Sequence, residues 1–198
     1  MIKKRRILTS ETEMKDLFIA WAIITIAFAN VLNGGNFVFW HYLVISAVAV
    51  GIGFILHEMG HKIVAQHYHC WAEFRANMSM LLVALFMSFF GFVFAAPGAV
   101  IIMGRVNRQQ NGKISMAGPL VNLIFAVLFL PLLFLSSGFL MELAKYGFLV
   151  NTWLGLFNLI PFGIMDGAKI LRWSSKVYGA MVFMGFILLI IGFSLGGI

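Results

Sequence analysis

The chain has 198 residues, of which 62% are hydrophobic and only 11% are charged. Soluble domains usually carry about a quarter charged residues, so this composition excludes a water-soluble globule and indicates a protein embedded in lipid. The net charge of +7 does not indicate a nucleic-acid partner, because the basic residues lie at the ends of apolar runs rather than on one basic face.

Five apolar segments predict membrane spans, each of which needs about 20 residues. They run from Leu17 to Leu32, from Tyr42 to about Ala65, from Ile114 to Leu135, from Phe148 to Phe162 with some extension, and from Val177 to Leu195. A further apolar stretch, from Met78 to Gly104, is interrupted by Gly91 and Pro97. We therefore expect an all-α polytopic membrane bundle of about five to six transmembrane helices, forming a single domain over residues 1–198.

The stretch from Met78 to Gly104 decides the topology. If it turns back inside the membrane and the N-terminus is cytoplasmic, every lysine and arginine except Lys145 lies at a cytoplasmic end, as the positive-inside rule requires. A full crossing would instead move Lys145 inside and six basic residues outside: Arg105, Arg108, Lys113, Lys169, Arg172 and Lys176. We therefore expect a re-entrant segment, a cytoplasmic N-terminus with its basic run from Lys3 to Arg6, and a multi-pass protein of the cell membrane.

Two short strands are expected beside the re-entrant segment. Residues from Glu73 to Met78 alternate between polar and apolar, and Ala99 to Ile102 is rich in β-branched residues. Non-helical backbone at membrane depth is tolerated only where it is buried in protein or lines a wet cavity. The pattern therefore predicts a small membrane-associated β-sheet beside a polar cavity that opens toward the cytoplasm.

The second apolar segment contains the motif His57-Glu58-Met59-Gly60-His61. On a helix the two histidines lie one turn apart on one face, where their ring nitrogens can share one zinc ion. Glu58 is adjacent to the first histidine and is suited to act as a general base. Ionisable residues are costly within a membrane span, so a cluster of three indicates a functional site. The single cysteine, Cys70, excludes a multi-cysteine metal cluster.

Three other histidines are poor candidates for a third zinc ligand. His41 lies about 24 Å before His57 along a continuous helix, which is out of reach. His67 has the spacing of the third histidine in metzincins, but Val64 stands where that motif needs a glycine to turn the chain. We interpret His67 and His69 as residues of the cytoplasmic interface.

Asp166 is the preferred third ligand. It follows the span that ends near Pro161, and the predicted topology places that end on the cytoplasmic side, together with His61. Catalytic zinc usually has three protein ligands and a water molecule, so two imidazoles and one carboxylate would complete the protein's share. The alternative for Asp166 is a turn or helix-cap residue ahead of Gly167.

These motifs resemble those of the site-2 protease family of intramembrane zinc metalloproteases. The resemblance rests on the His-Glu-x-x-His motif in an early span, followed by Asn158, Pro161 and Asp166-Gly167 near the cytoplasmic end of a later span. The segment from Ala117 to Asn122 is similar to the Gly-Pro-rich helix start of that family. The likeness covers the chain from about Leu43 to Leu171. One departure is Ile164, which stands where the family commonly carries a second proline.

The resemblance implies one Zn²⁺ per chain, bound by His57, His61 and Asp166, with Glu58 as the general base. It implies hydrolysis of peptide bonds in or near the transmembrane segments of membrane-anchored protein substrates, as in regulated intramembrane proteolysis. Asn122 and Asn158 are candidate donors to the oxyanion, and an interhelical hydrogen bond remains the alternative for each. The predicted strand edge would give an unwound substrate a template for β-augmentation.

A membrane metal-ion transporter or channel is the alternative function, with the same residues forming a transit site. Transport favours several exchangeable sites along a pathway, whereas this sequence shows one dense cluster. A catalytically inactive membrane scaffold is a third possibility, but such a protein has no need of Glu58. The sequence indicates the bilayer as a partner and does not indicate the substrate, the signal for cleavage or the oligomeric state.

Overall fold

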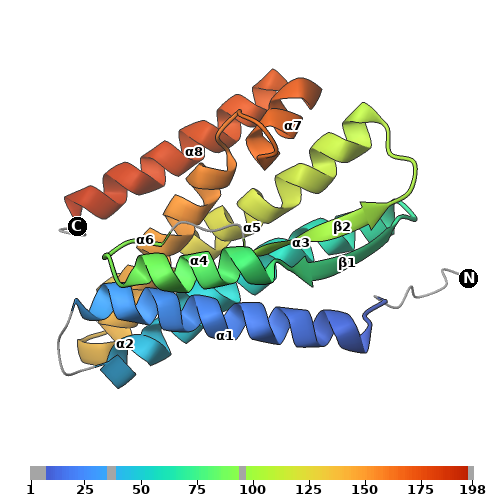
Figure 1. The fold of residues 1–198 in the computed structure, drawn as a ribbon. Coiled ribbons are helices and arrows are strands. Elements are labelled where there is room, and N and C mark those ends of the chain that lie inside the picture. The colour runs from blue at the N-terminus through green and yellow to red at the C-terminus, as the bar shows by residue number, and fades with distance from the viewer. Residues whose placement is uncertain (1–7, 35–38, 94–96, 196–198) are drawn as a thin grey trace, which may run out of the picture.

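The computed structural model describes residues 8–34, 39–93 and 97–195 as a helical bundle with a small sheet (Figure 1). The basic run from Lys3 to Arg6 lies outside the described residues. The helices are α1 (Glu11–Asn33), α2 (Phe39–Ser46), the π-helix η1 (Ala47–Ile52), α3 (Gly53–His67), α4 (Met78–Ser88), α5 (Arg108–Leu135), α6 (Gly138–Asn158), α7 (Asp166–Trp173) and α8 (Ser175–Ser194). The strands are β1 (Trp71–Ala76) and β2 (Gly98–Met103).

Four helical stretches in the described residues are long and apolar enough to cross a membrane. They are α1, the continuous stretch Phe39–His67, α5 and α8, and they correspond to four of the predicted spans. The span predicted over Phe148 to Phe162 is not among them. Helix α6 has 21 residues, but Glu142, Lys145 and Asn151 lower its hydropathy, and it ends at Asn158. The predicted fold class, a helical membrane bundle with a small sheet, is confirmed.

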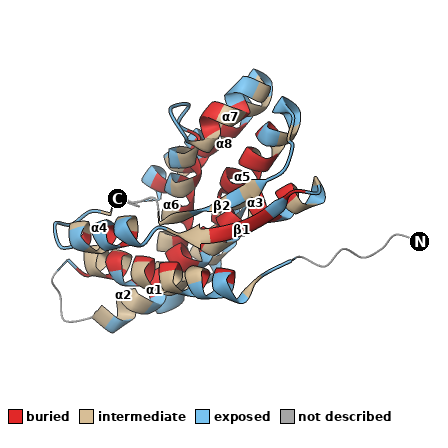
Figure 2. Ribbon diagram, turned by 45° about the vertical axis from the view of Figure 1, so that its right-hand side comes forward, coloured by how far each residue is buried: buried red, intermediate tan, exposed pale blue. Residues whose placement is uncertain are grey.

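Helix α3 lies between two packed halves of the molecule. On one side, α1, α2 and the sheet form a core around Ile45, Phe54 and Phe74. On the other side, α5, α6 and α8 pack around Leu123 and Phe148. Figure 2 shows buried residues concentrated in α3, α5 and β1. Large apolar side chains on the outward faces of α4 and α8 are exposed, as is expected of surfaces that contact lipid.

The segment from Met78 to Gly104 leaves the sheet and returns to it. Strand β1 leads into α4, and β2 then pairs antiparallel with β1, from Trp71 opposite Met103 to Ala76 opposite Gly98. At the base of this excursion, the Asn77 N–H donates to the Pro97 carbonyl at 2.9 Å. Residues 94–96 lie outside the described part. Both ends of the segment therefore lie side by side, and α1, α5 and α8 begin at the same end of the molecule (Figure 1).

Both predicted strands are present, with different ends. Strand β1 begins at Trp71 and ends at Ala76, whereas alternation predicted Glu73 to Met78. The difference arises because the Asn77 side chain accepts a hydrogen bond from the Met80 N–H and so caps α4. Strand β2 extends the predicted Ala99 to Ile102 by one residue at each end.

Helix α1 covers the outer edge of β1. Glu13 accepts a hydrogen bond from the Phe74 N–H at 3.0 Å, and Asp16 accepts one from the Ala76 N–H at 3.3 Å. Glu13 also forms an ion pair with Lys62 of α3, and both side chains are fully buried. These contacts satisfy the edge of β1 and fix α1, α3 and the sheet together.

The π-helix η1 leads directly into α3. A π-helix leaves main-chain carbonyls without the usual partners, and such turns occur frequently at functional sites. Here the Trp21 indole donates to the Ala47 carbonyl at 3.1 Å, and the Asn151 amide donates to the Ala49 carbonyl at 2.8 Å. A Cβ at Gly51 would overlap the Trp21 indole. Helices α1 and α6 thus stabilise the irregular turn that sets the orientation of α3.

Candidate metal centre

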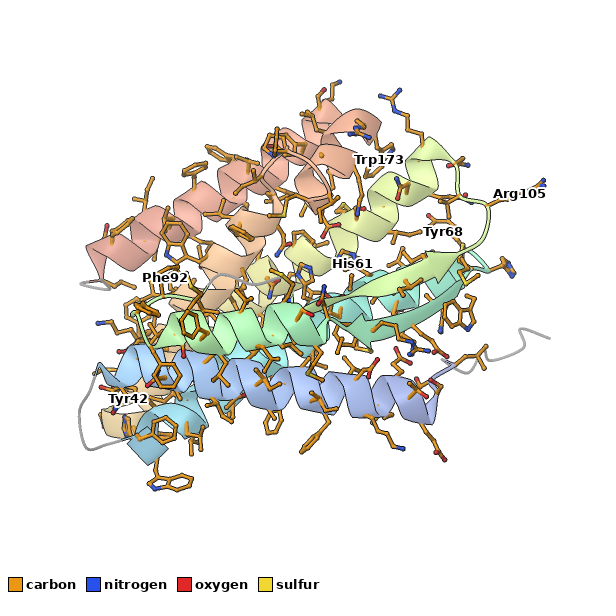
Figure 3. All side chains as sticks on the ribbon, in the orientation of Figure 1. Tyr42, His61, Tyr68, Phe92, Arg105 and Trp173 are labelled. Atoms are coloured by element: carbon orange, nitrogen blue, oxygen red, sulfur yellow. The ribbon has the colours of Figure 1, made fainter. Side chains whose placement is uncertain are left out.

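His57 and His61 lie on the face of α3 that packs against α5. Their side chains are buried, and the two Nε2 atoms are 3.1 Å apart. Figure 3 shows His61 in the interior of the molecule, away from the end marked by Arg105 and Trp173. The spacing of four residues on one helix thus brings the two imidazoles together, as the sequence predicts.

The other nitrogen of each imidazole has its own partner. His57 Nδ1 lies 2.5 Å from Asn122 Oδ1, and His61 Nδ1 lies 2.8 Å from the Ile114 carbonyl oxygen. Each oxygen can accept a hydrogen bond from an Nδ1–H group, and in the neutral imidazole this leaves Nε2 with a lone pair. This arrangement fixes the ring orientation and the tautomer that metal-ligating histidines need.

Asp166 joins the two histidines from α7. Its Oδ2 lies 3.0 Å from His61 Nε2 and 3.7 Å from His57 Nε2. The ligand atoms of these three residues all lie within 4.8 Å of one another. Burial raises the pKa of Asp166, but the adjacent His57 and His61 imidazoles outweigh burial and hold this pKa below its ordinary value. The carboxylate is therefore ionised at neutral pH.

Two glycines bring Asp166 to this position. Gly163 has a φ of 60°, in the left-handed region that favours glycine, and allows the chain to turn back after α6. Gly167 packs against the Leu159 main chain so closely that a Cβ would overlap the Leu159 carbonyl. Ile164, which lies between these two glycines, is 86% exposed.

Gly118 of α5 leaves the space in front of the two Nε2 atoms open. A Cβ at this position would lie 2.6 Å from His57 Nε2 and closer still to His61 Nε2. Gly118 and Pro119 lie within α5 rather than at its start, contrary to the prediction from the sequence. The helix begins at Arg108 because Asn107 and Gln110 form a capping box. The glycine therefore provides space at the ligand atoms and does not start the helix.

Glu58 lies beside the three clustered residues and faces the sheet. Its buried carboxylate accepts a hydrogen bond from the Val100 N–H of β2 at 3.1 Å. The cluster thus combines two imidazoles with the carboxylates of Glu58 and Asp166, and Lys169 Nζ lies 3.4 Å from Asp166 Oδ1. Two nitrogen donors and an oxygen donor that lie within 4.8 Å of one another fit a zinc ion bound by His57, His61 and Asp166.

The other histidines lie elsewhere. His41 forms a 2.6 Å contact with Glu142, and His67 is the exposed last residue of α3, where its ring contacts Tyr68. Helix α3 continues through Val64 without a turn, as expected for a β-branched residue. His69 is exposed in the turn before β1. The structure therefore gathers Asp166, and none of these histidines, with the pair on α3.

The two asparagines considered as oxyanion donors have different surroundings. Asn122 is fully buried, and its amide nitrogen donates to the Gly53 carbonyl and to Asn151 Oδ1, at 3.2 and 3.0 Å. Because both N–H groups are engaged, the geometry favours a positioning role for Asn122 through His57. The Asn158 amide donates to the Leu154 carbonyl of its own helix at 2.9 Å.

Sequence reasoning missed several residues that support the cluster. Asn151 links the π-helix to Asn122, and as an amide inside an apolar helix it could have been recognised as a buried hydrogen-bonding group. The Ile114 carbonyl carries no signal in the sequence, because its role depends on how α5 crosses α3. The Val100 N–H contact with Glu58 depends in the same way on the strand register.

The chain is 38% identical over 173 residues to a protein of Methanocaldococcus jannaschii named "Putative zinc metalloprotease MJ0611", and the match covers 85% of this chain and 88% of that protein. It is 31% identical over 184 residues to "Zinc metalloprotease MJ0392" of the same organism, covering 90% of this chain and 47% of that protein. No protein-family model matches the chain, and no solved structure matches it significantly. The likeness to these two proteins extends over most of the chain. The chain belongs to their family, the zinc metalloproteases.

Proposed function

We propose that this chain is an intramembrane zinc metalloprotease of the site-2 protease kind. Its substrates are membrane-anchored proteins, which it cleaves in or near their transmembrane segments. The observation that carries the proposal is the convergence of His57, His61 and Asp166 within 4.8 Å, on and beside a 29-residue apolar helical stretch. The protein lies in the cell membrane with several spans, and its N-terminus and the opening to the cluster face the cytoplasm.

His57, His61 and Asp166 would hold one zinc ion per chain. When bound, zinc supplies a Lewis acid that polarises the substrate carbonyl and lowers the pKa of water. Asn122 and the Ile114 carbonyl orient the two imidazoles, so that both Nε2 atoms face the same space. The scaffold thus positions its ligands with buried hydrogen bonds rather than with mobile loops.

Glu58 acts as the general base and general acid. Its carboxylate takes a proton from the attacking water and returns it to the nitrogen of the leaving amine. The Val100 N–H holds Glu58 beside the ligand cluster, on the side of the sheet. A general base must lie next to the metal ligands without being one of them. Glu58 meets this requirement, because it follows His57 and is not among the three proposed ligands.

Strand β2 provides the template for the substrate. A helical substrate hides its scissile carbonyl in internal hydrogen bonds, so it must unwind before attack. Helix α1 covers the outer edge of β1, whereas the outer edge of β2 faces Glu58 through the Val100 N–H. An unwound segment that pairs with β2 would therefore lie next to the catalytic carboxylate and the ligand cluster.

The test compares proteolysis with metal transport in proteoliposomes. Wild-type protein should cleave a membrane-anchored reporter, and Glu58→Gln should cleave it at least about 100-fold more slowly, because the general base is lost. Zinc content should not change, since Glu58 is not a ligand. Full cleavage by Glu58→Gln would exclude this mechanism, and zinc flux without cleavage would favour the transporter.

A further inference from the structure

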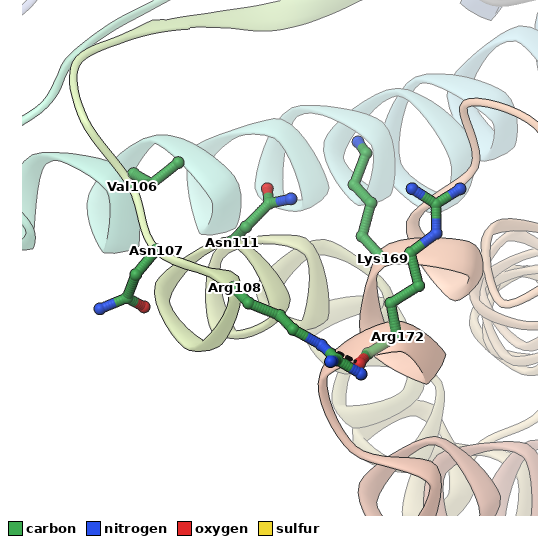
Figure 4. Close-up of a pocket in the computed structure, with 6 residues that line it drawn as sticks. All are labelled: Val106, Asn107, Arg108, Asn111, Lys169 and Arg172. Carbon is green, nitrogen blue, oxygen red and sulfur yellow. Dashed lines mark hydrogen bonds between the residues drawn. The ribbon is translucent and has the colours of Figure 1, made fainter.

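A basic pocket lies between the start of α5 and α7, apart from the zinc ligands. It has a volume of about 510 Å³. Figure 4 shows the residues that line it: Val106, Asn107, Arg108, Asn111, Lys169 and Arg172. Three of the six side chains are cationic and none is acidic. The pocket therefore combines a concave shape with a positively charged lining.

Packing holds the two sides of this basic pocket together. Arg108 Nε donates to the Arg172 carbonyl oxygen, which joins the start of α5 to the end of α7 (Figure 4). Behind the pocket, a Cβ at Gly112 would lie 2.5 Å from Trp173 Cγ, so α5 and α7 approach closely at this glycine. The three cations are thus held on a rigid pair of helices.

Like charges that share a pocket repel one another, and an anion relieves the repulsion. Arg108 and Arg172 offer forked N–H donors that match the oxygens of a phosphate group. Asn107 and Asn111 add amide groups to the same lining. Among the described residues, Lys169 is the one cation of the three that contacts a carboxylate, that of Asp166, so the two arginines carry most of the charge available to a ligand.

The location of the pocket indicates which anion is at hand. Helix α5 is one candidate span and has Arg108 as its first residue, while α8, another span, begins at Ser175, directly after α7. The pocket therefore lies where two apolar helices begin, which in a membrane spanned by α5 and α8 is the level of the lipid headgroups. Phosphate groups of anionic lipids are concentrated at this level and attract basic residues.

We propose that this basic pocket binds the phosphate group of an anionic lipid headgroup. The lipid tails would lie along the exposed apolar surfaces of the neighbouring spans. Arg108 and Arg172 bind the phosphate oxygens, and Lys169 adds a third positive charge. Lys169 lines the pocket and also contacts Asp166. A bound headgroup would therefore lie next to the ligand cluster, separated from it by the Lys169 side chain.

The test measures lipid retention by native mass spectrometry of the full chain with added phosphatidylglycerol or phosphatidylcholine. The pocket variant is Arg108→Gln with Arg172→Gln. The matched control is Arg105→Gln with Lys176→Gln, which removes the same charge from exposed positions near the same helix ends but outside the pocket lining. Lys169 is left unchanged because it contacts Asp166.

Wild type should retain phosphatidylglycerol in preference to phosphatidylcholine. The pocket variant should bind phosphatidylglycerol about tenfold more weakly, whereas the control should stay within about twofold of wild type. Arg172→Gln alone keeps the hydrogen bond from Arg108 to the main-chain carbonyl of residue 172, so it controls for a folding defect. It should bind phosphatidylglycerol about threefold more weakly than wild type. Equal losses in both double variants, or displacement of the lipid by millimolar inorganic phosphate, would overturn the proposal.

Discussion

Helix α3 carries two buried polar clusters that differ in how their charges are balanced. One is the ion pair of Lys62 and Glu13, in which the Glu13 carboxylate also accepts a hydrogen bond from the Phe74 N–H. The other is the ligand cluster of His57, His61 and Asp166, with Glu58 beside it. His61 and Lys62 are neighbours in the sequence, yet His61 contacts α5 and Lys62 contacts α1.

The difference separates a structural cluster from a functional one. Lys62 and Glu13 neutralise each other, and the Thr9 hydroxyl accepts a second hydrogen bond from the lysine at 2.9 Å, so this cluster needs no ligand. Glu58 and Asp166 contribute two carboxylates. Of these two, Lys169 contacts that of Asp166, at 3.4 Å. Buried carboxylates are costly unless they are paired or bind a metal. The second cluster therefore fits a divalent cation, and the first fits none.

The largest effect is expected from breaking the ion pair. Glu13→Gln keeps an acceptor for the Phe74 N–H but leaves the Lys62 ammonium buried without an anion. Removing one partner of a buried pair costs about 3 to 5 kcal/mol, so the free energy of unfolding should fall by about 3 kcal/mol. Thermal or denaturant unfolding in detergent micelles measures this change.

The double variant Glu13→Gln with Lys62→Met provides the control. It removes both charges and keeps an acceptor for the Phe74 N–H, so most of the lost stability should return. Zinc content of the double variant should match that of wild type, because neither residue belongs to the ligand cluster. If the double variant were as unstable as Glu13→Gln, the pair would have a role beyond charge compensation.

A smaller effect is expected from Asn122→Ala in the ligand cluster. The substitution removes the acceptor that orients His57, and the loss of such outer partners typically lowers metal affinity by about 10- to 100-fold. Competition with a zinc chelator of known affinity measures the change. Asn158→Ala is the matched amide control and should bind zinc as wild type does, since Asn158 bonds within its own helix. A reversed order of the two variants would contradict the assignment of Asn122.

The smallest effect concerns the edge of β2. Val100→Pro removes the N–H that faces Glu58 but keeps the ladder to β1, because proline is tolerated where the N–H points away from the partner strand. Loss of one main-chain donor should slow reporter cleavage by about tenfold, with zinc content unchanged. Unchanged cleavage would show that neither the position of Glu58 nor the binding of substrate depends on the Val100 N–H.

The ligand cluster was predictable from the sequence because local rules place its members. Four-residue spacing aligns His57 with His61. The topology inferred from the positive-inside rule places Asp166 at the same end of the bundle. The four apolar spans and the doubling back of residues 78–104 follow from hydropathy and from the same bias. Each of these features depends on the period of a helix or on the cost of charge in lipid.

The pair of Glu13 with Lys62 was not predictable, because its partners are 49 positions apart and depend on how α1 crosses α3. The length of α6 was misjudged, since Glu142 and Lys145 interrupt the apolar pattern while the helix continues. Gly118 was taken as part of a helix start, whereas it provides space for the histidine nitrogens. Such roles depend on contacts between elements, which a single sequence does not encode locally.

The most direct measurement is zinc K-edge X-ray absorption of the purified protein, together with Asp166→Ala. Wild type should bind one zinc ion per chain, with two imidazoles and oxygen donors in the first coordination shell and no sulfur. Asp166→Ala should lose zinc to a chelator more than about 100-fold more readily, since it lacks a ligand rather than an outer partner. A sulfur ligand, or a zinc site unaffected by Asp166→Ala, would contradict the proposed metal centre.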